Sequence, residues 1–266
     1  MKRVVIVGLV LGAVFFSWVF LSARHLGQDG EFLFTNTNQA ALSENIFIRG
    51  NTQAKEVALT FDADMTPRML KELNEGKVKS WYNQSVINVL RQNQVPATLF
   101  LTGLWIKAYP EITTELSQDP LFELGNHSYT HGGFSGSCYH LNPIKNDQDR
   151  VEIQDTEDLL AKYATAHQKY FRFPGLCSDA YDLGVVKNLG YQTIGGDVIG
   201  GDGFTQNAAA IAKRVVSRVK PGSIVILHMH GAPDAPATAL ALPTIISDLK
   251  AKGYTFVKVS QLLGKS

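Results

Sequence analysis

The stretch Val57-Ala-Leu-Thr-Phe-Asp-Ala-Asp-Met65 is an apolar, β-rich run that ends in two acids one residue apart. A buried parallel strand delivers polar groups to the rim of a sheet or barrel in this way. If the strand continues through Asp64, its two-residue period places Asp62 and Asp64 on one face and Ala63 on the other. Two carboxylates this close repel one another unless a proton or a cation relieves the repulsion. The pair is therefore either a surface turn or half of a cation site.

Around this stretch, apolar runs alternate with amphipathic segments. Seven runs have the composition of strands: Val57–Phe61, Ala97–Leu101, Leu121–Leu124, Tyr170–Phe173, Tyr191–Ile194, Ile224–Leu227 and Tyr254–Val259. Helices are predicted between most of them, for example at Ser85–Gln94, Asp155–Tyr163, Ala208–Val219 and Leu242–Lys252. This alternation predicts an α/β fold, most simply a distorted (β/α) barrel with about seven parallel strands.

The composition limits the classes of function. The chain has 266 residues, 45% of them hydrophobic, which is enough for one full core or at most two. The formal net charge is +1, and acids and bases are interspersed. Because no basic stripe is present, the sequence predicts no nucleic-acid partner.

The amino terminus differs from the rest. Lys2 and Arg3 precede an apolar run from Val4 to Ala23, which predicts an N-terminal hydrophobic helix. Its length suits either a cleaved signal peptide or an uncleaved membrane anchor, so the remainder is expected outside the cytoplasm, in the periplasm or at the cell surface. The predicted organisation is a signal or anchor at 1–26, a linker or arm at 27–54 and a catalytic domain at 55–266.

The polar residues fall at equivalent places along the chain. Each of five predicted strands ends in, or is followed by, chemically capable side chains: Asp62 and Asp64, His127, Arg172, Asp197 and His228. In a parallel α/β barrel the carboxyl ends of the strands share one rim, and chemistry takes place at that rim. The five positions together therefore predict a single site.

A metal is predicted from His127-Ser-Tyr-Thr-His131. On one helical turn, residues four apart share a face, so both imidazoles could reach one ion. Two histidines and Asp64 form a set that suits Zn²⁺ or another divalent metal and leaves positions open for water and substrate. The alternative is a pair of ordinary surface or core histidines.

The remaining groups suit acid–base work. Asp62 is the spare carboxylate beside Asp64 and is the predicted base for a metal-activated water. His228 is the predicted acid, with His230 as a rival. Arg172 would hold Asp62 ionised. Asp197 would orient His228, and Asp202, in Gly200-Gly-Asp-Gly203, could replace it.

At this point the sequence resembles a known family. Thr-Phe-Asp-Ala-Asp, Asn-His-Ser-Tyr-Thr-His, Arg-Phe-Pro-Gly and Ile-Leu-His, in this order, are similar to motifs of the polysaccharide deacetylases of carbohydrate esterase family four. The resemblance covers about Lys55 to the C-terminus. It implies a distorted (β/α) barrel and metal-dependent removal of N- or O-acetyl groups from a glycan. The implied roles are base for Asp62; metal ligands for Asp64, His127 and His131; acid for His228; and support for Arg172 and Asp197.

Three departures from the family pattern concern the pocket. Ala63 separates acids that are commonly adjacent in the family, although strand alternation keeps both on one face. Gly175 stands where an aromatic residue often follows the proline; its N–H could still bind the oxyanion, but a side-chain contact is lost. Gly203 and Phe204 follow Asp202 where the family usually has tryptophan.

The two cysteines, Cys138 and Cys177, could pair in an oxidising compartment, with two separate buried thiols as the alternative. A bridge would join the long loop 132–150 to the segment after Arg172, beside the pocket.

The sequence therefore predicts an exported deacetylase that acts on an acetylated glycan, N-acetyl before O-acetyl. The predicted metal is Zn²⁺, with Co²⁺, Ni²⁺ and Mn²⁺ as alternatives. Peptidoglycan, a poly-N-acetylglucosamine and xylan remain open as substrates, as does the oligomeric state. The rival hypotheses are hydrolysis of a non-sugar amide and a glycan-binding relative without activity. Retention of both Asp62 and His228 argues against the second rival, because binding alone needs neither.

Overall fold

The computed structural model describes residues 46–264 except 51, 137, 146 and 232. The chain divides into two units, Met1–Asn36 and Thr37–Ser266, and every described residue belongs to the second. The predicted hydrophobic helix at 4–23 lies outside the described residues. Among those that are described, no helix combines the length and the apolar content that crossing a bilayer requires.

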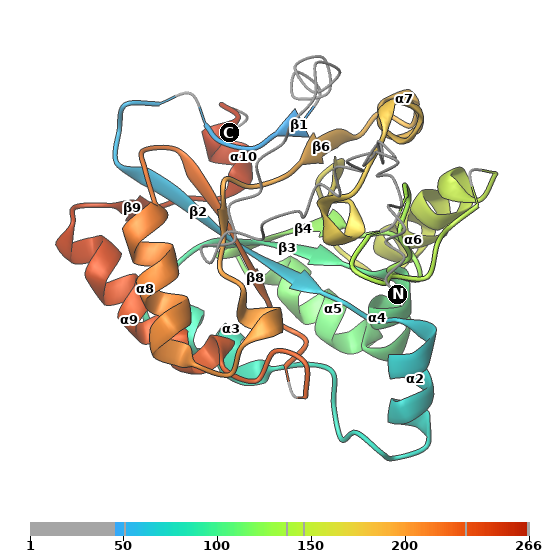
Figure 1. The fold of residues 1–266 in the computed structure, drawn as a ribbon, viewed down its shortest axis with the longest axis horizontal. Helices are drawn as coiled ribbons and strands as arrows, with labels where there is room; N and C mark the ends of the chain where they lie inside the picture. The colour runs from blue at the N-terminus through green and yellow to red at the C-terminus, as the bar shows by residue number, and fades with distance from the viewer. Residues whose placement is uncertain (1–45, 51, 137, 146, 232, 265–266) are drawn as a thin grey trace, which may run out of the picture. The chain divides into compact units, whose positions relative to one another are not determined.

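Strands and helices alternate along the described chain (Figure 1). The strands are β1 Ile46–Phe47, β2 Glu56–Ala63, β3 Ala97–Leu101, β4 Phe122–Asn126, β5 Tyr170–Phe171, β6 Gln192–Ile194, β7 Val198–Ile199, β8 Ser223–His228 and β9 Thr255–Phe256. The helices are α2 Pro67–Asn74, α3 Gln84–Gln92, α4 Gly103–Ala108, α5 Pro110–Gln118, α6 Asp149–Tyr163, α7 Ala180–Asn188, α8 Ala208–Arg218, α9 Thr238–Ala251 and α10 Val259–Leu262. Two 3₁₀ turns are η1 Pro174–Leu176 and η2 Asp202–Phe204.

The strands form one curled parallel sheet. Their order is β1-β6-β5-β4-β3-β2-β8-β7, with β9 alongside the first residues of β2. All pairs of strands are parallel, so the predicted α/β distorted barrel is confirmed. Each of the seven predicted strands has a counterpart, and the short strands β1 and β7 are additional.

Strand β2 lies inside the sheet because it is apolar on both faces, as a strand covered on both sides must be. Val57, Leu59 and Phe61 belong to the larger apolar core, which helices of the outer layer share. Ala58 points to the opposite face of the strand and belongs to a second cluster with Phe100 of β3. The two-residue period continues from Ala58 through Thr60 to Asp62 and places that carboxylate on the same face as Ala58.

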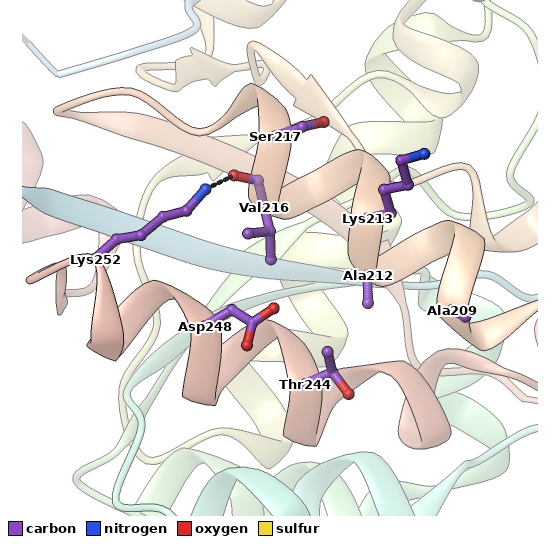
Figure 2. A pocket seen from close by; sticks show the side chains of 8 residues that line it. All are labelled: Ala209, Ala212, Lys213, Val216, Ser217, Thr244, Asp248 and Lys252. Carbon is purple, nitrogen blue, oxygen red and sulfur yellow. Dashed lines mark hydrogen bonds between the residues drawn. The ribbon is translucent and has the colours of Figure 1, made fainter.

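Outer helices α8 and α9 pack side by side (Figures 1 and 2). The Asn207 side chain accepts the N–H of Ala210 and caps α8, whose buried residues include Ile211 and Val215. A groove of about 340 Å³ runs between the two helices, and Lys252 spans its end by donating to the carbonyl of Val216, 2.7 Å away (Figure 2). None of the residues that line this groove is a predicted site residue.

A short segment before β2 links strand β6 to strand β8. Strand β1 pairs with β6, and Arg49 forms an antiparallel bridge with Ser223 at the start of β8. The N–H of Gly50 donates to the carbonyl of Gly222 at 2.8 Å. This part of the predicted linker or arm is therefore hydrogen-bonded to the barrel.

The contact at Gly222 predicts a difference between two glycine substitutions. Gly222 has φ +79°, and a Cβ there would lie 2.3 Å from the Gly50 carbonyl oxygen. Gly76 has φ +69° but nothing within 4 Å of the same position. Both G222A and G76A should incur the cost of about 1 kcal/mol or more for a side chain at positive φ. Because only G222A also displaces Gly50, we expect its free energy of unfolding in urea to fall by at least about 1 kcal/mol more. Equal losses would show that 46–50 is not fixed against β8.

Candidate functional site

The two acids of the first strand face the same group of histidines. Asp62 is the penultimate residue of β2, and Asp64 follows the strand directly. An Asp64 oxygen, Oδ1, lies 3.4 Å from Nε2 of both His127 and His131. The Asp62 oxygen Oδ2 lies 3.8 Å from the same nitrogen of His127. The structure thus brings together both carboxylates and both imidazoles, from parts of the chain more than sixty residues apart.

The two histidines do not lie on a helical turn, and that part of the sequence prediction was wrong. Strand β4 ends at Asn126, and the chain continues in an irregular loop with positive φ at Ser128 and His131. Side chains take the N–H groups that a helix would use, because Asn126 accepts from Ser128 and Glu152 accepts from the two residues that follow. The loop nevertheless places the two rings 5.0 Å apart, centroid to centroid.

The donor atoms of Asp64, His127 and His131 lie within 4.8 Å of one another, as a metal site requires. The Asp64 Oδ1 atom is buried and has no hydrogen-bond partner among the described residues. On His127, Nδ1 lies 2.8 Å from the carbonyl of Arg172 and can donate to it, which leaves the Nε2 lone pair free. An unpartnered buried oxygen and two imidazole nitrogens converging on one point fit a divalent metal.

The charges around Asp64 agree with this assignment. Burial raises the pKa of Asp64, but the four neighbouring imidazoles together lower it more, so the net pKa lies well below its usual range; they belong to His131, His230, His127 and His228. Burial lowers the pKa of His131 to about 4. At neutral pH the carboxylate is therefore ionised and the His131 imidazole is neutral, as metal ligands must be.

Arg172 lies where predicted, just after β5, and holds Asp62. Its Nη1 donates to Asp62 Oδ1 at 2.6 Å and to the Thr60 hydroxyl at 2.8 Å. Its other nitrogens donate to the carbonyls of Ile194 and Gly195. The guanidinium is fully buried; burial lowers the pKa of Arg172 and the Asp62 carboxylate raises it. Thr60 was not among the predicted site residues, although the two-residue period from Asp62 places it on the same face of β2.

His228 is oriented by Asp202 rather than by Asp197. Asp202 Oδ1 lies 2.8 Å from Nδ1 of His228, and Oδ2 accepts the backbone N–H of the same residue. Asp197 instead accepts from the hydroxyl of Ser223 and the N–H of Ile224. The sheet register explains the difference. Val198 and Ile199 of β7 pair with Val225 and Ile226 in the middle of β8. Asp197 precedes this pairing and therefore lies away from the carboxyl end of β8, where His228 is located.

The surroundings of His228 influence its charge. Burial lowers the pKa of His228, but the Asp202 carboxylate raises it more, and the net value is about 10. His228 Nε2 lies 3.9 Å from Asp64 Oδ2, and its ring is 5.3 Å from that of His230. The rival His230 also faces the site, with Nδ1 3.6 Å from Asp64 Oδ2 and Trp81 at its edge. Both histidines of the His-x-His pair therefore lie beside Asp64.

Gly175 and the cysteines form the neighbouring rim. The predicted disulfide between Cys138 and Cys177 is confirmed, with Cα atoms 6.0 Å apart. Gly175 lies in turn η1 with φ +60°, and a Cβ there would be 2.5 Å from Cys138 Sγ and 3.0 Å from the Tyr139 ring. The loop that carries Cys138 and Tyr139 thus occupies the space that a side chain at position 175 would need. The role of the Gly175 N–H in binding an oxyanion stays a prediction.

Comparison with known proteins identifies similar chains. The sequence model of the family described as polysaccharide deacetylase matches residues 49–194. The peptidoglycan-N-acetylglucosamine deacetylase of Bacillus cereus is 30% identical over 211 residues, which cover 79% of this chain and 88% of that protein. The peptidoglycan-N-acetylmuramic acid deacetylase PdaA of Bacillus subtilis is 28% identical over 220 residues, 82% of this chain and 74% of that protein.

Solved structures are similar over the same region. PdaA, described as a family 4 carbohydrate esterase, superposes with a TM-score of 0.68 and 26% identity, covering 87% of this chain and 90% of that one. A family 4 acetyl xylan esterase from Clostridium thermocellum, in complex with a cobalt ion, gives a TM-score of 0.63 and 29% identity, covering 79% and 91%.

The convergence on Asp64 predicts which side chains govern metal affinity. We expect D64N and H127A each to weaken Zn²⁺ binding by more than about 100-fold, above the 10- to 100-fold typical of an outer partner. H140A replaces an exposed histidine of the neighbouring loop and should leave the affinity unchanged. Calorimetric titration of the metal-stripped protein would measure all three. A D64N protein that binds Zn²⁺ like the wild type would refute the assignment.

Proposed function

The chain belongs to the polysaccharide deacetylase family, and from this premise we propose that it is a metal-dependent hydrolase that removes acetyl groups from a polysaccharide outside the cytoplasm. One observation supports the proposal most strongly: Asp64, His127 and His131 converge on one point with Asp62 alongside. A pure binding site would not need the second carboxylate, nor an imidazole held on the other side of Asp64.

Asp64, His127 and His131 are the proposed metal ligands. Zn²⁺ is the first candidate because two imidazoles and a carboxylate suit it, and Co²⁺, Ni²⁺ and Mn²⁺ are alternatives; the acetyl xylan esterase structure contains cobalt. When bound, the metal would supply a Lewis acid that polarises the acetyl carbonyl and lowers the pKa of water.

Asp62 is the proposed general base. It takes a proton from the attacking water while the oxygen of that water bonds to the acetyl carbon. Arg172 holds Oδ1 of this carboxylate by a 2.6 Å hydrogen bond, which leaves Oδ2 directed toward His127 and the metal position. The hydrogen bond from Arg172 fixes the direction of the Asp62 carboxylate, so the base needs no reorganisation before the reaction.

His228 is the proposed general acid. As the bond between the acetyl carbon and the sugar nitrogen or oxygen breaks, Nε2 donates a proton to the departing atom. Asp202 binds Nδ1 and the backbone N–H, so the reacting nitrogen faces Asp64. The Gly175 N–H is proposed to stabilise the oxyanion. The products are acetate and a free amino or hydroxyl group on the glycan.

The proposed substrate is a cell-wall or envelope polymer with N-acetyl groups. Two relatives are named as deacetylases of peptidoglycan N-acetylglucosamine and N-acetylmuramic acid, which supports an N-acetyl substrate and an extracytoplasmic location. The apolar run at 4–23, behind Lys2 and Arg3, would provide export or membrane anchorage. We propose the arrangement of a leader or anchor at 1–26, an arm at 27–54 and the catalytic domain at 55–266.

Acetate release from peptidoglycan and from acetylated chito-oligosaccharides tests the function. We expect wild-type activity to disappear with a chelator and to return with Zn²⁺. D62N should lower kcat by about 100-fold or more, since a general base contributes 10²–10⁴ in rate, while metal content stays at the wild-type level. Activity that survives both chelation and D62N would contradict the mechanism.

Substitution of Asp202 and of Asp197, the two aspartates near β8, should have different effects on kcat. D202N removes the anion that orients His228, so kcat should fall by about tenfold or more while the metal content is unchanged. D197N alters a carboxylate that accepts hydrogen bonds from Ser223 and Ile224 rather than from His228, and its kcat should stay within about twofold of wild type. The reverse ranking would assign the orienting role to Asp197.

A further inference from the structure

Two aromatic side chains are exposed beside the site. Phe204 is 76% exposed and Tyr139 is 47% exposed, yet their rings contact each other with centroids 5.9 Å apart. Exposing large apolar rings to water is unfavourable, and contiguous exposed apolar surface often marks a binding site. Packing in the apolar core does not account for the position of these two exposed rings, so we consider a role in binding.

Each ring is adjacent to a rigid anchor of the rim. Phe204 is two residues after Asp202, which is fully buried and fixed by His228 and by the hydroxyl of Thr238 at 2.6 Å. Tyr139 follows Cys138, which the disulfide ties to Cys177. The positions of both rings are thus set by groups that cannot easily move, as in a preorganised binding surface.

The backbone at Tyr139 adds a second observation. Tyr139 has φ +46°, in the left-handed region that side chains other than glycine rarely adopt. Such strain persists only where surrounding contacts enforce it, and it is concentrated at functional sites. Gly175 leaves room for this conformation, since a Cβ there would lie 3.0 Å from the Tyr139 ring.

The pair is continuous with the catalytic groups. A Cβ on Gly203 would lie 3.5 Å from the ring of His228. The residue before Phe204 is therefore in direct proximity to the proposed general acid. In the strand order, β4 and β5, which lead to the disulfide loop, lie on one side of β2, and β7, which leads to Phe204, lies on the other. The contact between Tyr139 and Phe204 therefore joins the two halves of the rim.

We propose that Tyr139 and Phe204 form a stacking platform for one sugar ring of the glycan substrate, with the Cys138–Cys177 disulfide holding Tyr139 in place. The proposal rests on the proposed function and identifies how the polymer is held. A pyranose whose hydroxyl groups are all equatorial presents only C–H groups on its two faces, and these carry partial positive charge. An aromatic face is electron-rich and apolar, so the two surfaces are complementary. The platform consequently favours a glucosamine-type ring over a sugar with axial hydroxyls.

Binding without turnover tests the platform. The probe is penta-N-acetylchitopentaose, titrated by calorimetry into the EDTA-treated full-length protein. We expect Y139A and F204A each to raise the Kd by about tenfold, the order of one aromatic stacking contact. Y139F and F204Y keep the rings and should keep the wild-type Kd. V151A, an exposed apolar residue on α6, is the surface control.

Each outcome decides the proposal. Wild-type protein that fails to bind the probe, or ring-removal variants that bind it like the wild type, would overturn the platform. In the metal-loaded protein, Y139A and F204A should also raise KM for the oligosaccharide with kcat within about twofold and leave hydrolysis of 4-nitrophenyl acetate unchanged. Equal losses on both substrates would overturn the platform as well, because they would show that the two rings support the catalytic groups and do not bind the sugar. Binding of the probe without any acetate release would overturn the proposed function alone.

Discussion

The site depends on the buried contact between Arg172 and Asp62. The guanidinium is fully buried and binds Thr60 and Asp62 of β2 and two carbonyls at the end of β6, and its own carbonyl lies within hydrogen-bond distance of His127. A buried charge without a partner is costly, and removing one member of a buried pair typically costs about 3–5 kcal/mol. One side chain therefore connects the strand of the base, the loop of a metal ligand and the neighbouring strand.

The convergence of the other groups follows from parallel strands. When adjacent strands run in the same direction, their carboxyl ends meet at one rim, whatever their distance in the sequence. Strands β2, β4 and β8 accordingly deliver Asp64, His127 and His228 to one place. The carboxylate of Asp64 then lies among imidazoles that hold it ionised, and burial keeps the His131 imidazole neutral. A cation at this point would give Asp64 Oδ1 the partner that it lacks among the described residues.

The rim loops provide what the strands do not. The loop after β4 turns back at positive φ instead of forming a helix, and the disulfide fixes its later part against the turn after β5. On the other side of β2, the Asp202 carboxylate fixes the turn η2, because it accepts hydrogen bonds from His228 and from the hydroxyl of Thr238. Each of these rim loops is thus fixed by one of its own side chains to another segment of the barrel.

The sequence by itself determined the alternation of strands and helices and the set of side chains at the strand ends. These follow from local rules, because periodicity and apolar content act within a few residues. It also indicated the pairing of Cys138 with Cys177, through their number and their places beside the same motifs. The tertiary structure alone decided that Asp202 and not Asp197 meets His228, since that depends on the register of β7 against β8. It also decided that His127 and His131 meet across an irregular loop and that Tyr139 contacts Phe204. Those outcomes depend on contacts between segments distant in the chain, which no local pattern of residues specifies.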